Sequence, residues 1–288
     1  MNNKKVDFLI IGAQKAGTTS LYRYISQHYD VYFSEVKEVN YFVLNHLYEK
    51  GESYYHSYFR GYRNQKTVGS AYVHMLPCHR SAARVKAYNP RMKLVVMLRE
   101  PVERAWSAYQ YALRNGWESP GHRFPDCIQL EGPRLTKEQY DLVYFYNGLY
   151  HLHLQHWLSN FPREQVLLIR LSDLQTEPAK TLAAVFNFLG LDPISIDTSA
   201  RFNEASNVFS TGLQKAMLTK GRRGRLLKNM IPQRVKVFVR SRIFPLIYRL
   251  NTRLVEDQPE LSEEDRLLVT PLFKEDLEKL RRDFGISF

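Results

Sequence analysis

The chain has 288 residues, of which 44% are hydrophobic and 24% charged, a composition that suits a folded domain and excludes a disordered chain. Its two cysteines, Cys78 and Cys127, lack CxxC spacing and exclude a structural zinc site or a disulfide framework. The net charge of +12 originates between residues 205 and 255, where twelve Lys or Arg occur without one acid. We therefore predict a single domain over residues 1–288, kept in a reducing compartment.

The amino-terminal residues predict a protein that stays in the cytoplasm. Their apolar run, Phe8 to Ile11, is far too short for the core of a signal peptide or for a membrane span. Peripheral contact with a membrane surface is compatible with this location.

Two apolar runs in the first part of the chain predict buried strands that each lead into a helix. The run at 6–11 ends at Gly12, and helical spacing of apolar residues begins after Thr18. The run at 94–98 is followed by a helical pattern with Pro101 in its first turn, a position that proline suits. Each unit is thus a strand, a short loop and a helix.

The same alternation continues further along the chain. A run at 166–169 precedes a helix that Gly190 ends, residues 141–159 predict one long amphipathic helix, and a last helix is expected over 262–282. Parallel strands need crossover connections, which these helices supply. We expect a three-layer, P-loop-like α/β fold with a central parallel sheet and an all-helical C-terminal part, the basic segment at about 211–288.

The loop between the first strand and its helix is suited to bind phosphate or sulfate. It reads Gly12-Ala13-Gln14-Lys15-Ala16-Gly17-Thr18-Thr19-Ser20. Free backbone N–H groups and the positive end of the helix dipole converge at such a junction. A Walker A loop would carry Lys where this chain has Thr18, whereas Lys15 suits a donor with one 5′-phosphate and a sulfate. An ordinary glycine-containing turn is the alternative.

Two segments together resemble the family of sulfotransferases that depend on PAPS (3′-phosphoadenosine 5′-phosphosulfate, whose spent form is PAP). The likeness is to the branch with bacterial members and heparan-sulfating domains. Residues 14–21, Q-K-A-G-T-T-S-L, are similar to the family's 5′-phosphosulfate motif, and residues 98–107, L-R-E-P-V-E-R-A-W-S, resemble its 3′-phosphate site. Further matches are residues 37–42, 148–150 with Trp157, 171–174 with Pro178, and 188–191, so the resemblance covers nearly the whole chain.

The resemblance implies how the donor is bound. The binding residues would be Lys15, Ala16, Gly17, Thr18, Thr19, Ser20, Arg99 and Ser107. Arg99 would clamp the 3′-phosphate with its planar guanidinium, and Ser107 would add a hydrogen bond. Lys15 would stabilise the leaving phosphate, and no metal ion is needed. A surface ion pair with Glu103 is the competing interpretation of Arg99.

The acceptor must lose a proton, so a general base is expected near the loop. Heparan-type relatives carry a Glu just after the second strand, and Ser70 stands at about that point here. His74 is the predicted base, because imidazole titrates near neutrality, and Glu38 is the alternate catalytic residue. The competing interpretations are that His74 only packs in its loop and that Glu38 orders the loop with Lys37.

Three histidines, His151, His153 and His156, are close in sequence but do not predict a metal site. On a helix His151 and His153 point in different directions, and no acid or cysteine completes a ligand set. We interpret them as a solvated helix face.

The basic residues between 215 and 253 have three interpretations: contact with a polyanionic acceptor, contact with an anionic membrane surface, or a solvated face. Amphipathic spacing after Pro232 favours a membrane, glycolipid or polysaccharide. Nucleic acid is not an expected partner, because no nucleic-acid-binding module is recognisable.

These features predict an enzyme that transfers a sulfuryl group from PAPS to a hydroxyl or amine of a polysaccharide, a glycolipid or a small metabolite. One alternative is a P-loop kinase or NTPase, which would need Lys at position 18 and an Asp after a strand that here delivers Arg99. The other is a catalytically idle nucleotide-binding protein that docks on a membrane or polyanion, and only Ser70 favours it.

Overall fold

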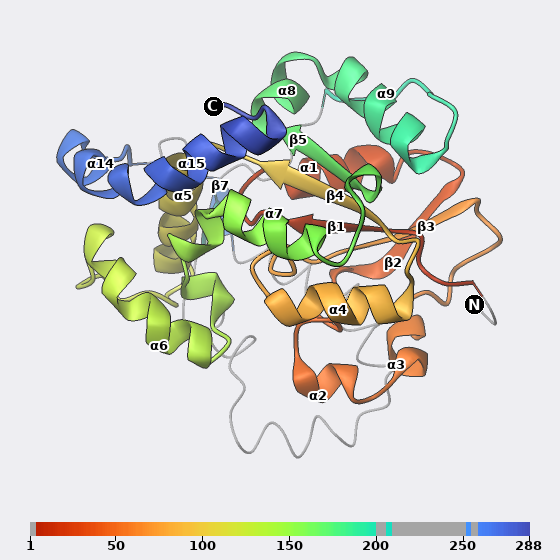
Figure 1. The fold of residues 1–288 in the computed structure, drawn as a ribbon, viewed down its shortest axis with the longest axis horizontal. Helices are drawn as coiled ribbons and strands as arrows, with labels where there is room; N and C mark the ends of the chain where they lie inside the picture. The colour runs from red at the N-terminus through yellow and green to blue at the C-terminus, as the bar shows by residue number, and fades with distance from the viewer. Residues whose placement is uncertain (1–3, 200–205, 209–251, 255–258) are drawn as a thin grey trace.

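A parallel sheet of five strands in the order β2-β3-β1-β4-β5 forms the centre of the computed structural model, which describes residues 4–199, 206–208, 252–254 and 259–288 (Figure 1). The strands are β1 (Phe8–Gly12), β2 (Val31–Glu38), β3 (Thr67–Ala71), β4 (Lys93–Leu98) and β5 (Val166–Arg170). The three strands predicted from apolar runs are thereby confirmed. β1 is buried over its whole length, as expected of a parallel strand covered on both faces.

Helices cover the sheet on both sides. In Figure 1, α1, α8 and α9 lie above the strands and α4 lies below them. The helices before residue 200 are α1 (Thr18–Ile25), α2 (Asn45–Tyr48), α3 (Glu52–His56), α4 (His79–Tyr88), α5 (Pro101–Arg114), α6 (Glu131–Thr136), α7 (Tyr150–Leu158), α8 (Leu171–Thr176) and α9 (Pro178–Leu189), with 3₁₀ turns η1 (Pro125–Leu130), η2 (Tyr140–Leu142), η3 (Tyr146–Gly148) and η4 (Arg163–Gln165). α9 ends at Gly190, which adopts the left-handed conformation, as predicted.

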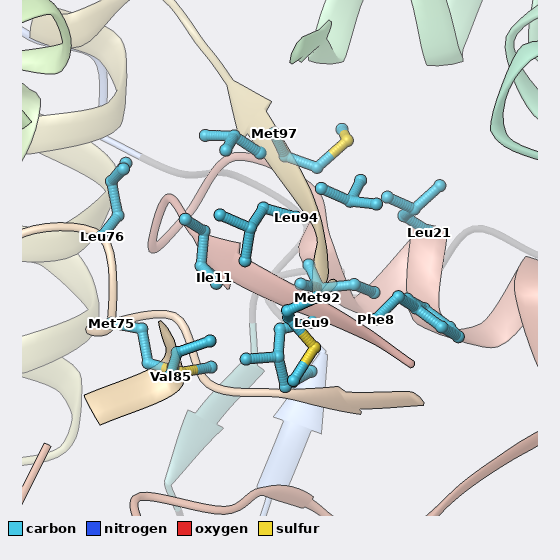
Figure 2. Close-up of a cluster of buried hydrophobic side chains, with 14 of the residues drawn as sticks. Phe8, Leu9, Ile11, Leu21, Met75, Leu76, Val85, Met92, Leu94 and Met97 are labelled. Atoms are coloured by element: carbon cyan, nitrogen blue, oxygen red, sulfur yellow. The ribbon is translucent and has the colours of Figure 1, made fainter. Parts of the chain in front are cut away.

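The core lies between the sheet and these helices. Alternate side chains of a strand point to opposite faces, so Leu9 and Ile11 of β1 face the layer that contains Val85 of α4, as Figure 2 shows. Phe8 points the other way, and its ring meets Phe33 of β2 edge-on at a centroid distance of 5.2 Å. This packing fixes where the carboxyl end of β1, and the loop after it, can lie.

The long helix predicted over 141–159 is wrong in its first half. The structure has η2 and η3 there, and regular helix begins only with α7. The carboxylate of Glu131 explains the break, because it accepts backbone N–H groups of Phe145 and Tyr146 at 2.6 and 2.8 Å that a continuous helix would bond internally. Gly148 follows in close contact with α15, where a Cβ atom would come within 2.7 Å of the Phe273 ring.

Residues 259–288 form two helices, α14 (Glu263–Val269) and α15 (Pro271–Phe284), in place of the single helix predicted over 262–282. Pro271 separates them, since it has no N–H to continue the first. Strand β7 (Thr252–Leu254) pairs antiparallel with β6 (Ser206–Val208), so the C-terminal part is not entirely helical. α15 packs on α7, and its Asp276 accepts backbone N–H groups from the first turn of α7 at 2.9 and 3.0 Å.

Most of the basic segment predicted at 215–253, including the helix expected after Pro232, lies outside the described residues. Among the helices that are described, none has the length and apolar character needed to cross a membrane.

Candidate active site

The sheet has a topological switch point between β1 and β4. These strands are neighbours, but the chain leaves β1 towards β3 and β2 and leaves β4 towards β5. In open α/β sheets, ligands bind in the crevice at the carboxyl ends of such a pair. The predicted phosphate loop follows β1 and Arg99 follows β4, and the Arg99 guanidinium Nη1 donates to the carbonyl of Lys15 at 3.4 Å. The structure thus brings the two predicted halves of the donor site together.

The loop after β1 has the geometry of an anion cradle. Gly17 is the N-cap of α1 with φ 84°, and a Cβ atom there would lie 2.6 Å from Leu171 Cδ1, so only glycine fits. No side chain caps the N-terminus of α1, and Thr18 and Thr19 open its first turn. Lys15 also has a positive φ, 65°, which is uncommon outside glycine and concentrates at functional sites. These residues fit the phosphosulfate end of the predicted donor.

The start of α5 is arranged differently. The Glu100 carboxylate accepts the N–H groups of Val102 and Glu103 at 3.1 and 2.7 Å, so this helix end is already capped by an anion. A phosphate near it would therefore depend on side chains, and half-buried Arg99 and Ser107 are available. The competing ion pair of Arg99 with Glu103 is also present, at 3.6 Å.

Lys15 projects toward α5, where its ammonium lies 4.6 Å from the centre of the Tyr111 ring. Burial, followed by the positive charges of Arg114 and Arg99, lowers the pKa of Lys15 to about 8. Sequence reasoning missed Tyr111 and Arg114. They follow Ser107 at four- and seven-residue spacing, the period of one helix face, which is the signal that could have found them.

Arg104 supports the loop from inside the protein. Its side chain is fully buried, contacts the Tyr144 carbonyl, and has Nη1 3.5 Å from the carbonyl of Gln14, the residue before Lys15. Burial lowers the pKa of Arg104. A buried arginine in a helix gives no distinctive sequence signal, so its supporting role becomes visible only in the structure.

His74 lies on the connection after β3, at the same edge of the sheet. Its side chain is 3% exposed, and Nε2 is 2.9 Å from Oδ1 of Asp141 in η2. Nε2 of Gln14 donates to the same oxygen at 3.0 Å. The structure thus joins the predicted base to the phosphate loop through Asp141, a residue to which sequence reasoning gave no role.

Glu38 and Ser70 lie close to His74 but are held by other groups. One Glu38 oxygen accepts the N–H of Val73 at 3.2 Å, and the other contacts the Lys37 ammonium. This arrangement supports the interpretation that Glu38 orders the loop. Ser70 is buried within β3, with its hydroxyl 3.4 Å from that of Ser34.

The interpretation of the three histidines as a solvated face is wrong. His153 is completely buried, and its Nε2 is 2.8 Å from the Tyr146 carbonyl. His151 pairs with Asp283 of α15 at 2.7 Å, and His156 contacts the His79 carbonyl at 2.8 Å. Packing of α7 against α4 and α15 explains the burial, which a helical pattern alone does not reveal. Within the described ranges, no group of three or more His, Cys, Asp or Glu is placed to hold a metal ion.

Comparison with known proteins agrees with this geometry. Residues 5–226 match the family model described as "Sulfotransferase domain". The chain belongs to the PAPS-dependent sulfotransferase family. The family, the α/β fold and the enzyme class predicted from the sequence are thereby confirmed.

Curated relatives of this sulfotransferase include two heparan sulfate enzymes. The bovine (Bos taurus) bifunctional heparan sulfate N-deacetylase/N-sulfotransferase 2 is 29% identical over 222 residues, which are 72% of this chain and 24% of the relative. The human (Homo sapiens) heparan sulfate glucosamine 3-O-sulfotransferase 3B1 is 30% identical over 205 residues, 68% of this chain and 49% of the relative. The chain therefore spans only a quarter to a half of these relatives.

A solved structure has a similar fold. The sulfotransferase from Alicyclobacillus acidocaldarius superposes with a TM-score of 0.71 at 24% identity, covering 99% of this chain and 98% of that one.

Proposed function

We propose that this sulfotransferase transfers the sulfuryl group of PAPS to a hydroxyl or amine of a polysaccharide acceptor. The observation that carries the proposal is the meeting of Lys15 and Arg99 at the β1/β4 switch point. PAPS carries a phosphate at the 3′ position of its ribose and a phosphosulfate at the 5′ position, so it needs two separate anion sites. A nucleoside triphosphate carries phosphates at the 5′ position alone and needs only one.

The donor would lie across this crevice. The backbone N–H of Gly17, with the hydroxyls of Thr18 and Thr19, would hold the 5′-phosphosulfate at the start of α1, and the N–H of Ala16, which donates to the Ala13 carbonyl at 3.2 Å, would share its hydrogen bond with the donor. Arg99 and Ser107 would hold the 3′-phosphate as a charge-assisted hydrogen-bonding pair. Ser20, in the first turn of α1, would complete the set of donor-binding side chains.

Transfer itself would depend on position and charge. The sulfuryl group moves in line from the phosphate oxygen to the acceptor, and negative charge develops on the departing phosphate. The buried ammonium of Lys15 would stabilise that charge, because a charge in a desolvated site acts more strongly than one in water.

The acceptor class is supported by the relatives, whose names specify heparan sulfate, a polysaccharide, as their substrate. The basic residues predicted at 215–253 would suit an anionic chain of this kind or an anionic membrane surface. Residence in the cytoplasm stays a prediction from the sequence.

Calorimetric titration with PAP and, separately, with ATP and magnesium tests the donor. We expect tight binding of PAP, weak binding of ATP, and weakened PAP binding in Arg99→Ala but not in Arg91→Ala, an exposed arginine away from the site. Preference for ATP would overturn the proposal.

Transfer of radioactive sulfuryl from PAPS to N-desulfated heparan sulfate tests the acceptor, and PAP binding without turnover on any carbohydrate would favour the idle nucleotide-binding protein.

A further inference from the structure

A half-exposed carboxylate, Asp141, lies beside the phosphate loop, and it comes from a part of the chain that no motif marks. Asp141 lies in the 3₁₀ turn η2, between α6 and α7. Its side chain is 51% exposed, whereas the His74 side chain that contacts it is 3% exposed. Of this pair, only Asp141 can meet an acceptor from solvent without rearrangement.

Two buried groups hold this carboxylate in place. Oδ1 lies 2.9 Å from Nε2 of His74 and 3.0 Å from Nε2 of Gln14, which donates to it. Gln14 is 6% exposed and directly precedes Lys15, so the contact ties Asp141 to the phosphate loop. The His74 ring also stacks on Tyr140 at a centroid distance of 5.9 Å, which fixes its orientation.

Asp141 lies beside the loop that would hold the phosphosulfate end of the donor. Arg99 and Ser107, the predicted 3′-phosphate ligands, follow β4 on one side of β1, whereas His74 follows β3 on the other. Asp141 is hydrogen-bonded to His74, after β3, and to Gln14, in the loop after β1, and its turn η2 also packs on α5, so the carboxylate borders the phosphate loop. An attacking oxygen and a leaving oxygen must lie on opposite sides of the sulfur.

We propose that Asp141 is the general base for the acceptor and that His74 is a positioning residue that acts through it. This inference rests on the proposed sulfuryl transfer. The Asp141 carboxylate takes the proton of the acceptor O–H or N–H as that atom forms a bond to sulfur. The bond from sulfur to the 5′-phosphate oxygen breaks with its electron pair remaining on that oxygen, which gives PAP. His74 Nε2–H and Gln14 Nε2–H keep the carboxylate directed at the acceptor.

This assignment accounts for two observations at once. Ser70 is at about the point where the resemblance implies a glutamate, and it is buried in β3, so this strand supplies no carboxylate there. His74 Nδ1 is buried and has no hydrogen-bond partner, and the other ring nitrogen is engaged by Asp141, so neither is directed at an acceptor. The Asp141 carboxylate, from η2, takes the role for which β3 supplies no acidic side chain.

Four variants separate the two roles, with transfer of radioactive sulfuryl from PAPS to N-desulfated heparan sulfate as the assay. Asp141→Asn keeps the size of the side chain but cannot take the proton, and kcat should fall about a hundredfold or more. Asp141→Glu should recover part of that loss. His74→Ala should lower kcat, and His74→Gln, which restores an N–H donor to Asp141, should recover most of it. Asp192→Asn, an exposed aspartate outside the site, is the matched control.

PAP titration of each variant distinguishes failure of this inference from failure of the proposed function. PAP affinity should change less than about threefold in Asp141→Asn while kcat falls. An Asp141→Asn enzyme that keeps wild-type kcat, or a His74→Gln enzyme as inactive as Asp141→Asn, would assign the base to His74 and overturn the inference. A wild-type enzyme that binds PAP but transfers sulfuryl to no carbohydrate would overturn the proposed function instead.

Discussion

The guanidinium of Arg99 donates a hydrogen bond to the backbone carbonyl of Lys15, a residue 84 positions earlier in the chain. Arg99 is placed by the end of β4 and Lys15 by the end of β1, and these parallel strands pair from Phe8 opposite Lys93 to Gly12 opposite Val96, with a shift in register after Ile10. The two residues predicted to bind the anionic groups of the donor are therefore held by the sheet itself, which requires no ligand to assemble them.

Selectivity for the 3′-phosphate should depend on Arg99. A hydrogen bond between charged partners contributes about 1.5–3 kcal/mol, so Arg99→Ala should weaken PAP binding by roughly 10- to 100-fold. Adenosine 5′-monophosphate, which lacks the 3′-phosphate, should bind equally to both proteins. Calorimetry with the two nucleotides measures the ratio, and an equal loss for both would show that Arg99 only supports the loop.

Because the reaction depends on the charge on Lys15, the plot of its rate against pH should have a descending limb at high pH. Its pKa is lowered to about 8 by burial and by Arg114 and Arg99, so the ammonium is lost as the pH rises through that value. kcat/KM for PAPS reports the free enzyme and should fall above pH 8. Arg114→Gln removes one positive charge and should move the limb to higher pH, whereas Arg91→Gln should leave it in place. An unshifted limb in Arg114→Gln would contradict this explanation.

Gly17 should tolerate no side chain. Its φ is 84°, and an added Cβ would lie 2.6 Å from Leu171 Cδ1, so Gly17→Ala should destabilise the fold by about 1–3 kcal/mol and abolish measurable PAP binding. Gly132→Ala is the control, because it lies in α6 with no atom within 4 Å of the new Cβ. Urea unfolding and PAP titration of both variants provide the measurement, and equal behaviour of the two would refute the steric argument.

Buried His153 should make the protein sensitive to acid. Desolvation is the main cause that lowers the pKa of His153 from 6.5 to about 3. Between pH 6.5 and about pH 3, His153 therefore binds a proton in the unfolded chain but not in the folded protein. Stability should therefore fall as the pH drops through this window, by up to about 1.4 kcal/mol per pH unit from this residue. Urea unfolding of wild type and His153→Gln from pH 7 to pH 4 tests the slope, which should be shallower in the variant. Parallel slopes would assign the acid sensitivity to other groups.

Local sequence determined the strand, loop and helix units and the two anion-binding motifs. Apolar runs of β1, β4 and β5 need no partner to be recognised, Gly17 is required by its own backbone conformation, and Lys15 and Arg99 are found by their place at strand ends. These features are encoded within a few neighbouring residues, so they are readable without the fold.

Only the tertiary structure decided which distant groups meet. The Glu131 carboxylate accepts the N–H groups of Phe145 and Tyr146, so the helix predicted from residue 141 does not form. The 3₁₀ turn that forms instead places Asp141 beside His74. A helical pattern cannot reveal such a contact, because it depends on a carboxylate from another element. The predicted donor-binding residues could thus be named from local motifs, whereas the carboxylate proposed to act on the acceptor could not, since long-range hydrogen bonds place it.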